Sequence, residues 1–291
     1  MKLARVILGL AIASLGTAAF AAESDLHLVM LKGKGVSSSF QKEVDKLGGE
    51  ITYSHDIGIA FVTGLSDDAA ATLGGHKGVQ EMMLDAQFEM DVMVDADSIA
   101  SADSLIESPD DPATAFFYAR QWNMRAISAD VAWNSGRLGS EGVTVAILDT
   151  GIDYTYPDLE GRVDLSRSVS FTPDDDFYVN LLFPGRHPIS DIGYHGTHVA
   201  ATVASNGLVA AGVTSKTTLI GVKVCSVVLG YCPGNAIIAG VLHAVDQGAD
   251  IANMSLGGSF SKSDYPGYVG FLNRIFNYAN SKGTLIVVSA G

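Results

Sequence analysis

Four short apolar runs in the second half of the sequence constrain the fold more than any other feature. Between them lie helical patterns, in which apolar residues recur every three or four positions until a glycine, Gly248 or Gly283, follows. Apolar runs of this length are typical of strands that are buried on both faces of a parallel sheet. Strands that alternate with helices predict an α/β fold, a doubly wound parallel sheet, over residues 116–291. The runs span residues 143–148, 219–224, 251–254 and 285–288.

Residues 25–85 show a different and more compact pattern. Ser38 and Ser66 are expected to cap two short helices, each of which ends at a pair of glycines. Four short strands flank these helices in the order β-α-β-β-α-β, which predicts a small ferredoxin-like α+β domain. The expected strands span residues 26–31, 51–53, 59–62 and 79–84.

An acidic segment separates the two patterns. From Glu81 to Asp111 the chain has ten acidic residues and no basic one. Such a run repels itself, so residues 86–115 are predicted to be an extended linker, with a short solvated helix around 100–105 as the alternative. The net charge of −14 is concentrated before residue 112, and no basic face for binding nucleic acid is expected.

The first residues have the pattern of a secretory signal. Lys2 and Arg5 precede an apolar run over residues 6–15, and Ala19-Phe20-Ala21 forms a small-x-small cleavage site. The run is too short to span a bilayer. We therefore predict a signal peptide over residues 1–21, export to the periplasm or the extracellular medium, and no membrane association once the signal is removed.

Export would place the two cysteines, Cys225 and Cys232, in an oxidising compartment. The residues between them include Leu229-Gly230-Tyr231, which is typical of a turn. A disulfide between the two is therefore expected, and two free thiols are the alternative.

In an open α/β sheet, ligands gather at the carboxyl ends of the strands. Asp149 comes directly after the run at 143–148, although an aspartate there is by itself typical of a turn. His195 begins a helix whose Val199 and Val203 are expected to face inward. The helix dipole disfavours a charged imidazole at this position, and a nearby carboxylate would fix its tautomer.

A third polar segment, Asn253-Met254-Ser255-Leu256-Gly257-Gly258, closes another predicted strand. Its glycines permit a second backbone to approach closely. Residues Ser255, Leu256 and Gly257 are therefore predicted to bind an extended peptide through main-chain hydrogen bonds.

Together, Asp149-Thr150-Gly151-Ile152-Asp153, the segment that starts at His195 and the segment 253–258 resemble the motifs of the subtilisin-like serine proteases. The resemblance implies a serine endopeptidase that acts on polypeptides without an organic cofactor. It also implies that Asp149 orients His195, that His195 takes a proton from a serine, and that Ser255 to Gly257 hold the substrate backbone. A carboxylate oxygen of Asp149 is then expected within about 2.6–3.2 Å of a ring nitrogen of His195. Residues 25–85 are similar to the inhibitory propeptide of the family, which would be an intramolecular partner of the protease.

The sequence departs from the family pattern at two places. Ala201 stands where the family usually has a glycine, a change that a small side chain is expected to allow. The last residue, Gly291, comes one position before the oxyanion-hole asparagine of the family, and no segment matches Gly-Thr-Ser-x-Ala, the nucleophile motif. These 291 residues are therefore expected to carry the aspartate and histidine alone and to be inactive by themselves. The alternative is a non-catalytic, peptide-binding pseudoprotease or a decayed fragment.

Metal binding gives two further interpretations. A catalytic metal site could be formed by His195 and His198 with Asp191 and His187, but zinc sites usually need clearer third and fourth ligands, so no metal at the catalytic site is expected. Family members often bind structural calcium, for which residues 174–176, three consecutive aspartates, are a candidate, and an exposed acidic loop is the alternative.

Overall fold

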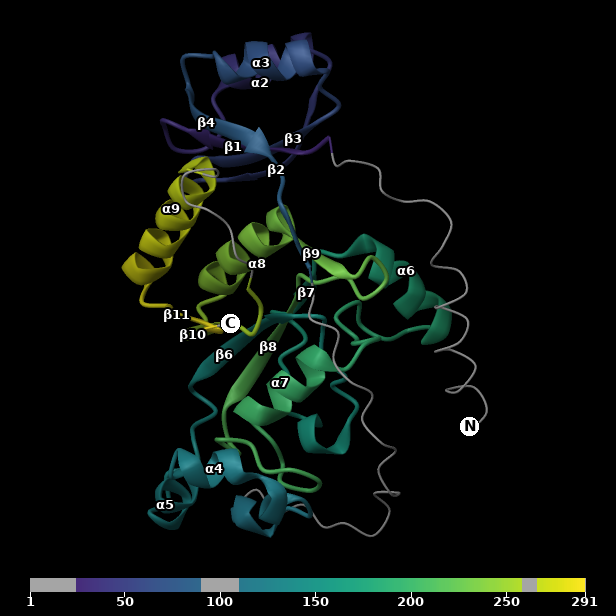
Figure 1. Ribbon diagram of the computed structural model, residues 1–291, viewed down its shortest axis with the longest axis vertical. Helices are drawn as coiled ribbons and strands as arrows, with labels where there is room; N and C mark the ends of the chain where they lie inside the picture. Colours follow the sequence, from purple (N-terminus) through teal and green to yellow (C-terminus); the bar gives the residue numbers. More distant parts are fainter. Residues whose placement is uncertain (1–24, 90–109, 258–265, 291) are drawn as a thin grey trace. The chain divides into compact units, whose positions relative to one another are not determined.

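The computed structural model describes residues 25–89, 110–257 and 266–290. The chain divides into two compact units, residues 1–85 and 86–291, called unit 1 and unit 2 below (Figure 1). The predicted signal peptide lies outside the described residues. No described helix is both long and apolar enough to cross a membrane.

Unit 1 consists of a four-stranded antiparallel sheet and two helices. The strands are in the order β2-β3-β1-β4, and every neighbouring pair is antiparallel. This is the ferredoxin-like arrangement of a β-α-β-β-α-β chain. The elements are β1 (His27–Leu31), α2 (Ser38–Lys46), β2 (Glu50–His55), β3 (Ile59–Thr63), α3 (Asp67–Gly74) and β4 (Val79–Leu84).

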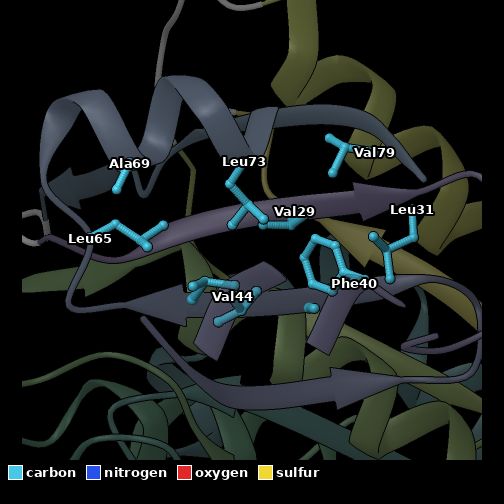
Figure 2. Close-up of a cluster of buried hydrophobic side chains, with 10 residues drawn as sticks. Val29, Leu31, Phe40, Val44, Leu65, Ala69, Leu73 and Val79 are labelled. Atoms are coloured by element: carbon cyan, nitrogen blue, oxygen red, sulfur yellow. The ribbon is translucent and has the colours of Figure 1, made fainter. Parts of the chain in front are cut away.

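Alternating residues of the unit 1 strands face its helices. Val29 and Leu31 of β1 pack against Phe40 and Val44 of α2 and Leu73 of α3 (Figure 2). Both helices begin at a serine N-cap, as the sequence predicts. The serine hydroxyl accepts a hydrogen bond from a backbone N–H of the first turn that would otherwise be unpaired. The cap of α3 is the predicted Ser66, whereas the cap of α2 is Ser37, one residue before the predicted Ser38.

Unit 2 contains a five-stranded parallel sheet, as the apolar runs predict. The strand order is β11-β10-β6-β8-β7, with all neighbours parallel. The strands are β6 (Thr144–Asp149), β7 (Val169–Ser170), β8 (Thr218–Lys223), β10 (Ile251–Met254) and β11 (Leu285–Val288). The helices are α4 (Trp122–Ala126), α5 (Ala129–Asn134), α6 (Pro173–Leu182), α7 (His195–Val203), α8 (Gly234–Asp246) and α9 (Pro266–Lys282).

Both faces of the sheet are covered at its central strands β6 and β8, which explains their apolar side chains. The edge strand β11 was also expected to be buried, but Leu285, Val287 and Val288 are exposed. On one face, Val145 and Ile147 belong to a buried cluster that includes Ala200 of α7. On the other face, α8 approaches closely at Gly240, where a side chain would meet Val224 and Val222. Since helices pack on both faces, the fold class predicted from the sequence, a doubly wound α/β unit, is confirmed.

The two ends of the predicted linker, residues 86–115, form short elements that the charge pattern did not predict. Residues 87–89 form a short strand, β5 (Gln87–Glu89), which pairs with β9 (Tyr231–Pro233) in a two-stranded antiparallel sheet. Pro112–Thr114 is a turn of 3₁₀-helix, and Ala115 is buried in a cluster with Met124. The pairing partner of β5 is more than 140 residues away in the sequence, so a local charge pattern could not reveal it. Residues 90–109 of the predicted linker lie outside the described part of the chain.

Candidate active site

Asp149 lies at the carboxyl end of the central strand β6, as its last residue and not directly after it. The side chain is almost completely buried, with 1% of the residue exposed. Its Oδ1 accepts a hydrogen bond from the backbone N–H of Thr150 at 2.7 Å. The carboxylate is therefore held in place by the turn that follows the strand.

His195 is the first residue of α7, and its Nδ1 lies 2.7 Å from Oδ1 of Asp149. About a third of the imidazole, 31%, remains exposed to solvent. The helix comes this close because residue 196 is a glycine: a side chain there would collide with Gly151 O and lie 3.0 Å from Cβ of Asp149.

Val199 and Val203 of α7 pack against the buried apolar cluster, as predicted, although two smaller residues of the helix are buried more deeply. Gly196 and Ala200 are its buried residues, whereas Val199 and Val203 are only half-buried. Small residues on the inward face allow the helix to lie near the strand, and the two valines pack at the edge of the apolar cluster below. Ala201, the departure from the family pattern, is half-buried in the same edge.

Asp191 accepts hydrogen bonds from both the segment that follows Asp149 and the segment that follows His195. Its Oδ1 accepts from Thr150 Oγ1 at 3.1 Å and Gly193 N at 2.9 Å. Its Oδ2 accepts from the backbone N–H of Thr197 at 3.1 Å and the hydroxyl of Thr197 at 2.6 Å. Burial raises the pKa of Asp191 from 3.8 to about 6, although the hydrogen bonds from Thr197 and the nearby charge of Lys223 act in the opposite direction.

The metal interpretation of this region finds no support in these contacts, since Asp191 bonds to hydroxyl and backbone N–H groups. Within the described ranges, no three His, Cys, Asp or Glu side chains are placed to hold one metal ion.

The predicted substrate segment follows β10 at the same edge of the sheet. Asn253 donates from Nδ2 to Ser255 Oγ at 3.0 Å, and Ser289, just after β11, donates from Oγ to Leu256 O at 3.0 Å. Ser255 and Leu256 are half-buried, whereas Gly257 is exposed. The segment therefore lies beside the strand that ends at Asp149, β6, with its last residue open to solvent.

A second backbone edge, β9, was not predicted from the sequence. β5 pairs with it through Phe88 opposite Cys232, and Gly234 N donates to Ala86 O at 2.7 Å. The ring of Phe88 lies 5.5 Å from the ring of Tyr268 in α9. Cys225 and Cys232 form a disulfide that joins the end of β8 to β9. The cysteine spacing was the sequence signal that could have located this edge.

Comparison with known families decides which protein type this geometry belongs to. The model of the subtilase family, peptidase S8, matches residues 140–291, a range that includes Asp149, His195 and the segment 255–257. The chain belongs to the subtilase family. The resemblance found in the motifs is thereby confirmed.

Two curated proteins show how similar this subtilase is to other members of the family. The minor extracellular protease Vpr of Bacillus subtilis (strain 168) is 34% identical over 220 residues, which are 74% of this chain and 24% of the relative. Thermitase of Thermoactinomyces vulgaris is 32% identical over 187 residues, 63% of this chain and 58% of the relative. The chain thus spans about a quarter to just under three fifths of these relatives.

Solved structures agree on the fold. The epidermin leader peptide processing serine protease of Staphylococcus aureus has a TM-score of 0.67 at 19% identity, over 93% of this chain and 61% of that one. Fervidolysin of Fervidobacterium pennivorans has a TM-score of 0.63 at 22% identity, over 94% of this chain and 41% of that one. At these identities the likeness shows the fold alone.

The three consecutive aspartates of this subtilase do not form the exposed acidic loop that was the alternative to a calcium site. They occupy the first turn of α6, where carboxylates are stabilised by the helix dipole. Asp175 is fully buried, and its carboxylate lies 3.3 Å from Nζ of Lys223, which is also fully buried. The basic partner comes from β8, so the run of aspartates alone could not indicate it.

Proposed function

We propose that this subtilase is the precursor of a serine endopeptidase in which His195 is the general base and Asp149 orients it. The observation that carries the proposal is the 2.7 Å contact between Nδ1 of His195 and Oδ1 of Asp149. An ionised carboxylate can only accept, so this contact keeps the proton on Nδ1 and leaves a lone pair on Nε2. Nε2 would take the proton of an attacking serine hydroxyl and later give it to the leaving amine.

The nucleophile is proposed to come from sequence that the 291 residues do not include. None of their serines stands in a Gly-Thr-Ser-x-Ala segment. Ser255 lies in the proposed substrate segment, where its hydroxyl bonds to Asn253. We therefore expect these residues alone to lack peptidase activity.

The proposed substrate is an extended polypeptide bound as an additional strand. The pairing of β5 with β9 supports this mode, because a three-residue strand already forms main-chain pairs at this edge. Ser255, Leu256 and Gly257 would supply the opposite backbone edge, and the neighbourhood of Tyr268 would receive an apolar side chain in the position of Phe88.

Unit 1 is proposed to be an inhibitory propeptide. It ends at Asp85, and the next residues of the chain, β5, occupy the peptide-binding edge of unit 2. The face of the unit 1 sheet that is turned away from its own helices also carries apolar side chains, among them Leu28, Met30 and Phe61. Cleavage in the acidic segment after β5 would release the protease from this segment.

Secretion is a further part of the proposal. The disulfide between Cys225 and Cys232 suits an oxidising compartment, and the Vpr relative is named as extracellular. Another relative, 37% identical over 171 residues, is named the major intracellular serine protease of Bacillus subtilis (strain 168), so the family does not decide the location. Sequencing the N-terminus of the protein from culture medium would test it, with a start at Ala22 as the expected first processing product.

Reading the encoding transcript beyond the codon for Gly291 is the first test of the proposed activity. An asparagine codon followed further on by a Gly-Thr-Ser-x-Ala segment is expected. A stop codon at that point would overturn the endopeptidase proposal for this gene and favour a non-catalytic peptide binder.

The longer product then permits a matched pair of variants. His195→Ala should lower kcat for a peptide substrate by about a millionfold, the loss that follows removal of a triad histidine. His198→Ala is the control, because His198 is exposed one turn further along the same helix and should leave kcat within about twofold. Equal activity of the His195→Ala variant and the unmodified protein would refute the assignment.

A further inference from the structure

A buried ion pair lies beside the proposed active site, outside the residues that the proposed chemistry uses. Lys223 is the last residue of β8, and Asp175 lies in the first turn of α6. Neither side chain is exposed at all, and Nζ of Lys223 lies 3.3 Å from Oδ2 of Asp175. A buried ion pair is weak evidence for stability, because desolvation offsets its attraction, so its other contacts show what it does.

The carboxylate of Asp175 also holds the turn that leads into β9. Its Oδ1 accepts from Ser226 Oγ at 2.7 Å and from Val228 N at 3.1 Å, and its Oδ2 accepts from Val227 N at 3.1 Å. Three consecutive residues of one turn therefore converge on a single charged group. The turn closes onto β9 through the hydrogen bond from Ser226 N to Tyr231 O at 3.0 Å.

The same pair reaches the segment before His195. Nζ of Lys223 donates to Ser190 O at 3.0 Å, and Ser190 immediately precedes Asp191. Val227 packs against Gly193, where an added Cβ would lie 3.0 Å from a methyl of the valine. One ion pair thus connects helix α6, the histidine segment and the turn that carries the peptide-binding edge.

We propose that Asp175 and Lys223 are positioning residues that set the place of β9 relative to the histidine segment and thereby govern binding of the extended part of a peptide substrate. Neither residue touches the reacting atoms. The expected effect on substrate binding rests on the proposed function, whereas the expected effect on the structure concerns β9 and β5 alone. The pair acts through Ser226, whose hydroxyl is the shortest of the contacts that Asp175 makes with the turn.

The first experiment measures hydrogen exchange in the 291-residue chain and does not depend on catalysis. Ser226→Ala removes the hydroxyl that donates to Asp175 and accepts from Leu229 N, and it keeps both charges. We expect amides in residues 86–89 and 231–234 to exchange about tenfold faster, the effect of losing one buried hydrogen bond, while amides of β6 keep their rates. Ser205→Ala is the matched control, because Ser205 is also buried and bonds through its hydroxyl to Ala210 O, away from the turn.

The double variant Asp175→Asn/Lys223→Met removes both charges together, so that no unpaired charge is left in the core. It should accelerate exchange at residues 86–89 and 231–234 more than Ser226→Ala does. Unchanged exchange there in Ser226→Ala, or an equal change throughout unit 2, would overturn the proposal even if the double variant does not fold.

The second experiment uses the longer, active product and separates the proposal from the proposed function. Ser226→Ala should raise KM for a peptide that extends several residues before the scissile bond by about tenfold. The kcat and KM for an ester of a single amino acid, which cannot reach β9, should stay within about twofold of the unmodified values. Equal losses on both substrates would contradict the positioning role, whereas a lack of hydrolysis by the unmodified protein would contradict the proposed function alone.

Discussion

Units 1 and 2 both pack helices on a sheet, but they bury different kinds of side chain. The core of unit 1 consists of aliphatic residues and Phe40, and no polar or charged side chain is buried within its described residues 25–85. Unit 2 buries an apolar core of the same kind together with charged groups that include Asp149, Asp175, Asp191 and Lys223.

The difference separates the side chains that stabilise the fold from those that fix the positions of the proposed functional groups. Apolar contacts are non-directional, so the fold of unit 1 depends on volume and pattern. A buried carboxylate is costly unless hydrogen bonds or an opposite charge satisfy it, and then it fixes the directions of its partners. In unit 2, Asp175 and Asp191 each bind donors from two or more segments, and those segments carry the proposed catalytic and peptide-binding groups.

The largest expected effect comes from breaking the buried ion pair. Lys223→Met leaves Asp175 charged in the core and should lower the free energy of unfolding of unit 2 by about 3–5 kcal/mol. Urea unfolding followed by tryptophan fluorescence measures it, because both tryptophans, Trp122 and Trp133, belong to unit 2.

The matched control lies in unit 1. Lys46 and Glu43 form an ion pair at 3.0 Å in which the side chain of Lys46 is largely exposed. Lys46→Met should change the free energy of unfolding of unit 1 by less than about 0.5 kcal/mol. Hydrogen exchange of residues 38–46 measures it, because unit 1 has no tryptophan. Similar losses of stability in the two lysine variants would mean that the buried ion pair of unit 2 is no more important for stability than the exposed pair of unit 1.

The next effect tests the apolar core of unit 1. Leu73→Ala creates a cavity at a fully buried position of α3 and should destabilise unit 1 by about 3 kcal/mol. Hydrogen exchange of residues 27–31 should report the loss, because β1 lies in the same cluster. Leu84→Ala, at a position 56% exposed in the same unit, should have almost no effect. A comparable loss in both variants would show that burial does not decide stability here.

The elements of unit 1 and the parallel strands of unit 2 could be predicted because their signals are local. β4, β10 and β11 have the predicted bounds, and Ser66 caps α3 as expected. Alternating or continuous apolar runs identify a strand without knowledge of its neighbours. The same holds for Asp149 and His195, since each stands at the end of a recognisable element.

What could not be predicted depends on contacts between distant segments. β5 and β9 are strands of three residues that exist only as a pair, and neither has an apolar pattern of its own. Asp175 could not be distinguished from its two neighbouring aspartates, because its burial follows from Lys223 in another element. The sequence analysis considered Asp191 only as a possible metal ligand. The hydroxyl and backbone N–H groups that donate to its carboxylate are not visible in the sequence.

A third prediction concerns how the free energy of unfolding depends on pH through Asp191, a buried carboxyl group of unit 2. Burial raises the pKa of Asp191 from 3.8 to about 6, so the folded chain holds this proton more tightly than the unfolded chain. Between about pH 4 and 6 the folded state therefore binds more protons, and the free energy of unfolding should fall as the pH rises, by at most roughly 3 kcal/mol. Above pH 6 this contribution is constant.

Asp191→Asn should remove this slope, measured as urea unfolding at several values between pH 4 and 7. Asp164→Asn is the control that should leave the slope between pH 4 and 7 unchanged. The hydrogen bonds from Ser166 and Arg167 lower the pKa of Asp164 from its ordinary value of 3.8, so its contribution is lost only as the pH falls below this window. A slope in Asp191→Asn equal to that of the unmodified chain would exclude Asp191 as its source.

The smallest effect should follow reduction of the disulfide between Cys225 and Cys232. Residues 1–85 have no cysteine, so a reducing agent acts on unit 2 alone. The bridge closes a short loop of the unfolded chain, and its loss should cost about 2 kcal/mol. It also joins the end of β8 to β9, so hydrogen exchange at residues 231–234 should rise on reduction while residues 27–31 keep their rates. Cys225→Ser/Cys232→Ser should show the faster exchange without reductant and no further response to it. If reduction instead accelerated exchange equally in both units, the bridge would not be a local support of the β9 edge, and Asp175 would remain as the contact that holds the turn.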